Sequence, residues 1–462
     1  MDHHSQRDLT HDLVLPTLLF AALGAMTWAV RGCSGFGGSN GCIFAGVTWG
    51  AAWWFIAREP GARQSRPFAS GWIILALTVG IGFSGNRGWM QWPSFFDGLL
   101  QTNAAAGRAV PIPRAYGFVW LFIAGVPWAG LGACLLAWCG SPRPPPLRGW
   151  CLRLACGIGL ACLARVLFES FPEVFLPLYK AMKAQYQDLA ANPNLRRLTN
   201  DNRAAITHLG LYLGFLGYEL GRRHWQNVTL ILTVGLVNGV GWSLCQNWRW
   251  APRLWPGVSF NWWRCWESCA GISIGLAYGL AYYLVNRRVS GAGGALAGTP
   301  APRAHPNLER LGAYLGLLLG LGLSLRNGLK GWANIYLGNE KYWDRLLWQV
   351  MGPLLLLALV ALLAWLWLRP LPGDAARELA SSSGNLPALP GVFPGDVFPH
   401  AYRLVWLVLL LQNLIAQLVT GPHNAWNETV FSFYYLLLFI LSAVILHHFH
   451  FLKTHCPPPA ST

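Results

Sequence analysis

The segment LLWQVMGPLLLLALVALLAWLWL, residues 346–368, contains no charged side chain. An α-helix rises about 1.5 Å per residue, so a segment of this length spans the roughly 30 Å hydrocarbon core of a bilayer. Residues 13–30 and 430–449 form similar apolar blocks near the two ends of the chain. Blocks of this length predict an integral membrane protein.

The composition of the chain favours the same class. Of its 462 residues, 54% are hydrophobic and 11% are charged, whereas ordinary soluble domains have roughly 25% charged residues. A net charge of +16 would favour nucleic acid as the partner of a soluble protein, but here the basic residues lie between apolar blocks and form no single stripe. We therefore expect contacts with the lipid bilayer or an anionic ligand, and no nucleic-acid binding.

Twelve apolar blocks can be recognised along the chain. They predict an all-α integral membrane protein with about 12 transmembrane helices, arranged as six helix-loop-helix hairpins in a single polytopic domain, residues 1–462. An even number of crossings places both termini on one side of the membrane, here called side A, and the odd-numbered helices end on side B. The blocks are 13–30, 42–57, 68–84, 115–139, 150–168, 205–221, 227–244, 264–286, 308–325, 346–368, 402–420 and 430–449.

The connections on the two sides differ in composition. On side A, segments 287–307 and 371–399 are rich in Gly, Pro and Ser and are predicted to be flexible linkers. Side B connections are rich in Trp, Asn, Arg and Gly, so we expect the functional site there. Lys and Arg divide almost evenly between the sides. If the arginines beside polar motifs are left out of the count, side A carries more Lys and Arg than side B, which is typical of the cytoplasmic side. We therefore expect both termini to lie in the cytoplasm and the protein to lie in the plasma (inner) membrane.

Four of the odd-numbered blocks end in a similar pattern, which combines Gly or Ser with Arg or Asn and often with Trp. The pattern occurs at 31–34, 82–89, 241–250 and 322–328. It predicts an internal repeat, which many transporters contain. A simpler interpretation stays open, because Gly, Arg and Asn commonly cap helix C-termini and Trp commonly lies at headgroup level.

The segment RGCSGFGGSNG, residues 31–41, is the most unusual part of the sequence. Closely spaced glycines, including Gly37 and Gly38, let backbone N–H groups approach an anion. Arg31 would add a guanidinium that can hold a carboxylate or phosphate through two hydrogen bonds. The segment lacks the Lys of a Walker loop. It is predicted to be an anion-binding loop, with a tight turn or re-entrant corner as the alternative.

Residues 242–267 combine seven Trp with polar side chains that include Asn247, Arg249 and Glu267. Aromatic rings beside amides and charges suit a sugar-like ligand, and they suit a membrane interface as well. Glu267 lies just inside a predicted helix, where an ionisable residue needs a partner. We expect it to pair with Arg249 or Arg264.

These features favour a multi-pass transporter or solute-binding protein for a small polar or anionic, possibly sugar-like, ligand. The alternatives are a membrane enzyme acting on a lipid-linked or saccharide substrate, and a structural subunit of a membrane complex. The sequence indicates no catalytic set, cofactor or oligomeric state, and His447, His448 and His450 have no acidic neighbours that would favour a metal site. The predicted ligand-binding residues are Arg31, Gly37, Gly38, Asn86, Arg87, Asn247, Arg249, Glu267, Arg326 and Asn327.

Two further predictions concern ion pairs and disulfides. Glu219 is next to Arg222 and Arg223, a pattern typical of a surface ion pair at a membrane boundary. Cys33 with Cys42, and Cys245 with Cys265, flank two connections on side B. Each pair could form a disulfide if that side is oxidising.

Overall fold

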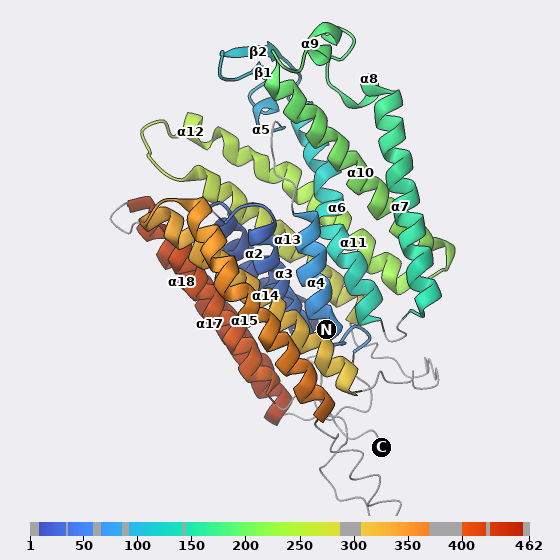
Figure 1. The fold of residues 1–462 in the computed structure, drawn as a ribbon, viewed down its shortest axis with the longest axis vertical. Coiled ribbons are helices and arrows are strands. Elements are labelled where there is room, and N and C mark those ends of the chain that lie inside the picture. Colours follow the sequence, from blue (N-terminus) through green and yellow to red (C-terminus); the bar gives the residue numbers. More distant parts are fainter. Residues whose placement is uncertain are drawn as a thin grey trace, which may run out of the picture.

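The computed structural model describes residues 9–33, 36–58, 66–85, 92–141, 145–286, 306–368, 400–421 and 426–455. These residues are almost entirely helical, apart from one antiparallel pair of short strands (Figure 1). The elements are η1 (Thr10–Val14), α2 (Leu15–Arg31), α3 (Ser39–Ala57), α4 (Trp72–Ser84), α5 (Trp92–Phe95), β1 (Leu99–Asn103), β2 (Arg108–Pro111), α6 (Ala115–Gly140), α7 (Leu147–Ser170), α8 (Pro172–Phe175), α9 (Lys183–Gln187), α10 (Pro193–Gly221), α11 (Trp225–Cys245), η2 (Gln246–Trp250), α12 (Ala251–Leu254), α13 (Trp262–Asn286), α14 (Pro306–Tyr336), α15 (Glu340–Leu368), α17 (Ala401–Thr420) and α18 (Trp426–His455).

Nine helices in the described part of the chain are long and apolar enough to cross a membrane, which indicates an integral membrane protein. Helix α4 is apolar but shorter, at 13 residues. Each of the twelve predicted blocks overlaps a helix. Helix α10 contains the block 205–221 but is longer, because it begins at Pro193 with a polar segment that lies outside the apolar pattern. The predicted linkers 287–307 and 371–399 lie almost wholly outside the described residues.

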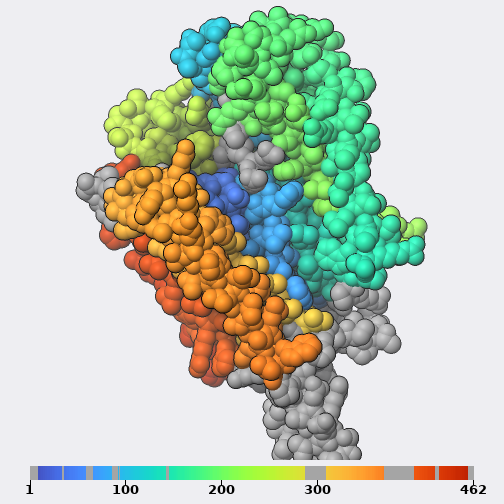
Figure 2. Space-filling view, viewed as in Figure 1, coloured from blue at the N-terminus to red at the C-terminus, as the bar shows by residue number. Residues whose placement is uncertain are grey.

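Six helices form a closed ring at the centre of the molecule. In order around the ring they are α2, α3, α4, α6, α11 and α13, and α13 packs again on α2. Helix α10 packs outside α6 and α7 packs on α10, while α14, α17 and α18 cover α2, α3 and α4, and α15 packs on α14. Figure 2 shows these two outer groups on opposite flanks of one face.

Glycines allow the ring helices to approach closely. A side chain at Gly271 or Gly275 of α13 would overlap the backbone of α2, at Gly24 and Phe20. Gly46 of α3 meets the backbone of α4 in the same way. Small residues four positions apart are typical of membrane helix pairs, whose association depends on close van der Waals contact. The ring is therefore held by backbone-to-backbone packing.

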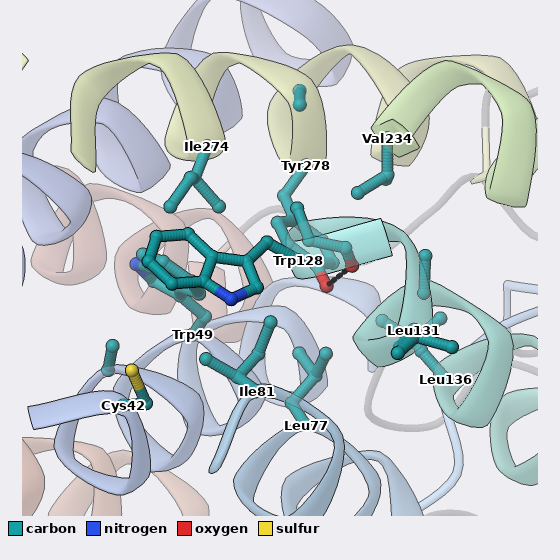
Figure 3. Packing of buried hydrophobic residues seen from close by; sticks show 14 of the residues in the cluster. Cys42, Trp49, Leu77, Ile81, Trp128, Leu131, Leu136, Val234, Ile274 and Tyr278 are labelled. Atoms are coloured by element: carbon teal, nitrogen blue, oxygen red, sulfur yellow. Dashed lines mark hydrogen bonds between the residues drawn. The ribbon is translucent and has the colours of Figure 1, made fainter. Parts of the chain in front are cut away.

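The interior of the ring is filled with aromatic side chains. Trp49, Trp128 and Tyr278 meet there beside Ile81 and Ile274, as Figure 3 shows. The ring centroids of Trp28 and Trp128 lie 6.4 Å apart, edge to face, a favourable arrangement for aromatic pairs. The ring of helices therefore encloses a packed core in this conformation.

At each end of the bundle, polar side chains form contacts between neighbouring elements. At the end where η1 begins, His11 Nε2 lies 3.1 Å from His448 Nε2 of α18, and the Glu309 carboxylate accepts a 2.7 Å bond from the Gly71 N–H before α4. This end corresponds to predicted side A. At the opposite end, side B, β1 and β2 form a hairpin whose Asn103 donates to Ala191 O over 3.2 Å.

Candidate anion-binding site

The glycine-rich segment connects α2 to α3 at side B. Helix α2 ends at Arg31, and α3 begins at Ser39 with Gly38 as its N-cap. Gly38 has φ 65° and ψ −142°, a conformation that favours glycine. The N-cap residue Gly38 supplies no side-chain cap, and the first N–H groups of α3 carry the partial positive charge of a helix N-terminus. Residues 34 and 35 lie outside the described part.

Arg31 runs from the end of α2 along this first turn. A side chain at Gly41 would lie 2.8 Å from Arg31 Cγ, so glycine is needed for the approach. The guanidinium lies between two indoles, with Cζ 5.3 Å from the Trp28 ring and 5.0 Å from the Trp128 ring. Cation–π contact of this kind stabilises a desolvated cation. Arg31 is thus a buried cation beside a helix N-terminus.

The hydrogen bonds of Arg31 are few and long. One Nη lies 3.4 Å from Glu267 Oε2, and the other donates to Gly85 O over 3.4 Å. Its Nε–H has no partner among the described residues. A guanidinium has five N–H donors, and strong ionic hydrogen bonds measure about 2.7–2.9 Å. Within the described part of the chain, Arg31 therefore makes only long hydrogen bonds to oxygen acceptors.

Other buried or partly buried arginines of this protein are held much more tightly. Arg153 Nε lies 2.5 Å from Glu219, Arg66 lies 2.7 Å from Asp12, and Arg326 lies 2.6 Å from Asp344. Each of these distances is typical of a strong ion pair. The comparison singles out Arg31 as the buried arginine best able to accept a new anionic partner.

Two ring helices are irregular close to Arg31. Helix α4 ends at Ser84, and Arg31 reaches the carbonyl of the next residue, Gly85. Helix α6 contains Pro127, which has no N–H to donate to the preceding turn. Nearby carbonyls of α6 accept bonds from other helices: Ser84 Oγ donates to Trp128 O (2.6 Å) and Asn238 to Gly125 O (2.6 Å). Such backbone breaks at membrane depth commonly line solute sites.

The structure brings together part of the predicted site. Arg31, Gly38 and Glu267 lie at the side B end of the ring, with Gly37 exposed beside them. The predicted partner of Glu267 was wrong, because the carboxylate pairs with Arg31, 236 residues away in sequence. Arg264 instead pairs with Glu428 and donates to Thr420 O over 2.8 Å. Asn86 and Arg87 lie outside the described residues.

The remaining predicted residues occupy two other places at side B. Asn247 and Arg249 are exposed, and Arg249 lies 3.2 Å from Asp97. Arg326 and Asn327 are buried between α14 and α15, where Arg326 donates to Asn327 Oδ1 over 3.0 Å and stacks over Trp348. These two groups have their own partners, so the structure does not gather the ten predicted residues around one cavity.

The Trp side chains of residues 242–267 also lie in two separate places. Trp242 belongs to the buried ring interior, whereas Trp248, Trp262 and Trp255 stack on one another outside it. Trp128 is the residue of the site that the sequence prediction missed. A Pro-Trp pair inside an apolar block was the only signal for it, because a mid-helix Trp is normally core.

Glu219 is a buried carboxylate, and the prediction of a surface pair was wrong. It is fully buried and accepts bonds from Arg153 (2.5 Å), His224 (2.7 Å) and Asn227 (2.9 Å). Arg153 comes from α7, 66 residues earlier in the chain. The network therefore fastens α7 to α10 and α11 at side A.

Cys33, Cys42, Cys245 and Cys265 are free thiols in the structure. Burial raises the pKa of Cys33, which lies just after α2, from 9.0 to about 11. Only the thiolate reacts with alkylating agents, so at pH 8 we expect Cys33 to react with iodoacetamide about a hundredfold more slowly in the folded protein than in the unfolded chain. Mass spectrometry of timed alkylation would measure both rates. Loss of a Cys33–Cys42 cross-link on reduction would contradict the free thiols.

No protein-family model matches this sequence, and no curated protein or solved structure matches it either. The class that the structure defines is an integral membrane protein with a ring of close-packed helices. Within the described ranges, no three His, Cys, Asp or Glu side chains converge as metal ligands.

Proposed function

We propose that this chain is a multi-pass membrane transporter or solute-binding protein for a small anionic solute, bound at the side B end of the six-helix ring. One observation carries the proposal: Arg31 is buried beside the N-terminus of α3, and among the described residues its hydrogen bonds to Glu267 and to Gly85 O are both 3.4 Å long. A carboxylate or other oxyanion could accept shorter bonds from the guanidinium and from the first turn of α3.

Transport is supported by the irregular helices around this position. The short helix α4 ends beside Arg31, and α6 contains Pro127, which removes one backbone hydrogen bond from the helix. Many secondary transporters bind their solutes where helices are broken inside the membrane. The packed aromatic interior below Arg31 would then be the closed barrier of this conformation, which a transport cycle must open towards side A.

The proposal includes a topology. We propose twelve crossings, formed by the nine long apolar helices together with α3, α4 and α10. The contact between His11 and His448 places the first and last helices at one end, which is consistent with an even number of crossings. We further propose that this end is cytoplasmic, that the membrane is the plasma (inner) membrane, and that the hairpins derive from an internal repeat.

Anion binding tests the proposal. Purified protein in lipid nanodiscs is titrated with sulfate, inorganic phosphate and D-gluconate, and affinity is measured by calorimetry and by the shift of the unfolding midpoint. We expect Arg31→Gln to weaken binding about a hundredfold, because charge-assisted hydrogen bonds contribute roughly 1.5–3 kcal/mol each. Arg31→Lys is expected to retain part of the affinity.

Two variants control for indirect effects. Arg31→Gln with Glu267→Gln removes both charges, so no carboxylate is left facing a lost guanidinium, and it should also lose binding. Arg249→Gln removes an exposed arginine at the same end of the bundle and should bind as the native protein does. Unchanged anion affinity in both Arg31→Gln variants would overturn the assignment of the site. If the native protein binds an anion in this test, uptake of that anion into proteoliposomes would then test transport.

A further inference from the structure

Gln246 is a buried polar side chain for which the described part of the fold provides no partner. It is the first residue of η2, directly after α11, and its exposed fraction is 1%. Among the described residues, neither Oε1 nor Nε2 of Gln246 has a hydrogen-bond partner. Burying an amide without a hydrogen bond lowers stability, so an unpaired one usually marks a bound water, an ion or a functional role. The sequence analysis selected its neighbour Asn247, which is exposed.

Gln246 faces the interior of the six-helix ring. Trp242, four residues earlier, is fully buried, and its ring centroid lies 6.4 Å from that of Trp28 on α2. The backbone stays helical through Gln246, with φ −62° and ψ −19°. Residues four apart on a helix lie on the same face. Gln246 therefore lies one turn beyond Trp242, towards side B, and continues the interior face of α11.

Arg31 lies at the same height in the ring. Its contact with Glu267, at 3.4 Å, gives its height along α13. A β-carbon at Gly241 of α11 would meet Ser273 Cβ of α13, so these two positions are also level. Helix α13 runs opposite to α11, and five residues from each position towards side B lead to Gln246 and to the residue after Glu267. Arg31 and Gln246 are therefore level with the same turn of α13, at the side B end of the ring.

These two side chains are complementary, but they are not bonded to each other. The Arg31 Nε–H has no hydrogen-bond partner among the described residues, and neither has the Gln246 Oε1 acceptor. The donors of Arg31 therefore lie more than a hydrogen-bond length from the amide oxygen. A small third group between the two side chains would satisfy both, as buried polar atoms require.

The amide adds a requirement that Arg31 alone does not impose. Gln246 Nε2 can donate to an anion oxygen, whereas Oε1 can only accept. One anion satisfies both atoms only if it carries an O–H beside its charged oxygens. Inorganic phosphate keeps at least one O–H at neutral pH. Sulfate and carboxylates are then fully ionised, and phosphate monoesters lose their last proton at about pH 6.

We propose that Gln246 is a specificity-determining residue of the anion site and that the solute is inorganic phosphate in its protonated forms. Arg31 binds the charged oxygens, Gln246 Nε2 donates to one of them, and Gln246 Oε1 accepts the O–H. This inference rests on the proposed function, because it needs Arg31 to bind the anion. Anion affinity then comes from Arg31, and the preference for an anion with an O–H comes from Gln246.

The test compares inorganic phosphate, sulfate and methyl phosphate on the full-length protein in phosphatidylcholine nanodiscs at pH 8. All three are then mainly tetrahedral dianions, but only inorganic phosphate keeps an O–H. Methyl phosphate stands for esterified phosphate, as in a lipid headgroup. We expect phosphate to bind about tenfold or more tightly than either of the others, because only phosphate pairs the buried amide oxygen.

Gln246→Leu should weaken phosphate binding about tenfold or more and should reduce the preference for phosphate over sulfate about fivefold. The same change removes an unpaired buried amide, so without anion the variant should unfold at the native midpoint or above it. A loss of binding is then not a loss of folding. Asn247→Leu is the matched control, since it removes an exposed amide at the next position, and it should leave all three affinities unchanged.

Three outcomes would overturn the inference while leaving the anion site at Arg31 intact. The first is equal affinity of the native protein for phosphate and sulfate, and the second is methyl phosphate binding as tightly as phosphate. The third is a native preference for phosphate over sulfate in Gln246→Leu. If none of the three anions binds the native protein, the proposed function itself is wrong.

Discussion

Replacing Arg153 by methionine is expected to lower the free energy of unfolding by about 3–5 kcal/mol, the usual cost of leaving one member of a buried ion pair without its partner. Glu219 is 0% exposed, and Arg153 supplies its shortest contact, at 2.5 Å. Without the guanidinium, the carboxylate keeps only His224 and Asn227 as donors among the described residues. Reversible unfolding in mixed micelles, followed by tryptophan fluorescence, would measure the difference.

The double variant separates the charge from the packing. In Arg153→Met with Glu219→Gln, no uncompensated charge is buried, so much of the lost stability should return. Arg165→Met is the matched control on the same helix, because Arg165 pairs with Glu169 at 3.2 Å but both side chains are more than half exposed. An exposed pair of this kind contributes about 0–1 kcal/mol. Similar losses in Arg153→Met and Arg165→Met would contradict the buried network.

The membrane class was predictable because its signal is local. The length and hydrophobicity of the block at 346–368 can be read directly from the sequence. Helix α15 occupies the same residues, with a short polar extension before them. Helix α10 was harder, since its first turns carry polar residues that no hydropathy window recognises. In the fold α10 packs against β1 and α9, and such tertiary contacts cannot be read from a hydropathy pattern.

The partners of buried charges were not predictable for a different reason. Sequence reasoning assigned Glu267 to Arg249 or Arg264, which are its neighbours along the chain. Helix α2 packs against α13 in the folded ring, so Arg31 reaches Glu267 instead, and Arg249 turns outward to Asp97. Which helices become neighbours depends on where glycines permit close contact. The sequence contains 52 glycines, and nothing in their spacing shows which of them face each other in the fold.

Gly271 carries the second large prediction, because it lies where α2 and α13 cross. A β-carbon there would overlap the carbonyl oxygen of Gly24, and the reverse holds for a β-carbon at Gly24. Backbone atoms cannot rotate away as side chains can, so Gly271→Ala must separate the helices. We expect a loss of about 3 kcal/mol or more in unfolding free energy, at or above the upper end of ordinary overpacking.

The same change should weaken anion binding, because α2 carries Arg31 and α13 carries Glu267. Gly159→Ala on α7 is the control: its added β-carbon meets no atom within 4 Å. There, alanine should be neutral or stabilise the helix by up to about 1 kcal/mol. The test compares the unfolding midpoints and sulfate affinities of the two variants in nanodiscs. If Gly271→Ala matches Gly159→Ala in both measurements, α2 and α13 do not cross at Gly24, and the ring that positions Arg31 is incorrectly placed.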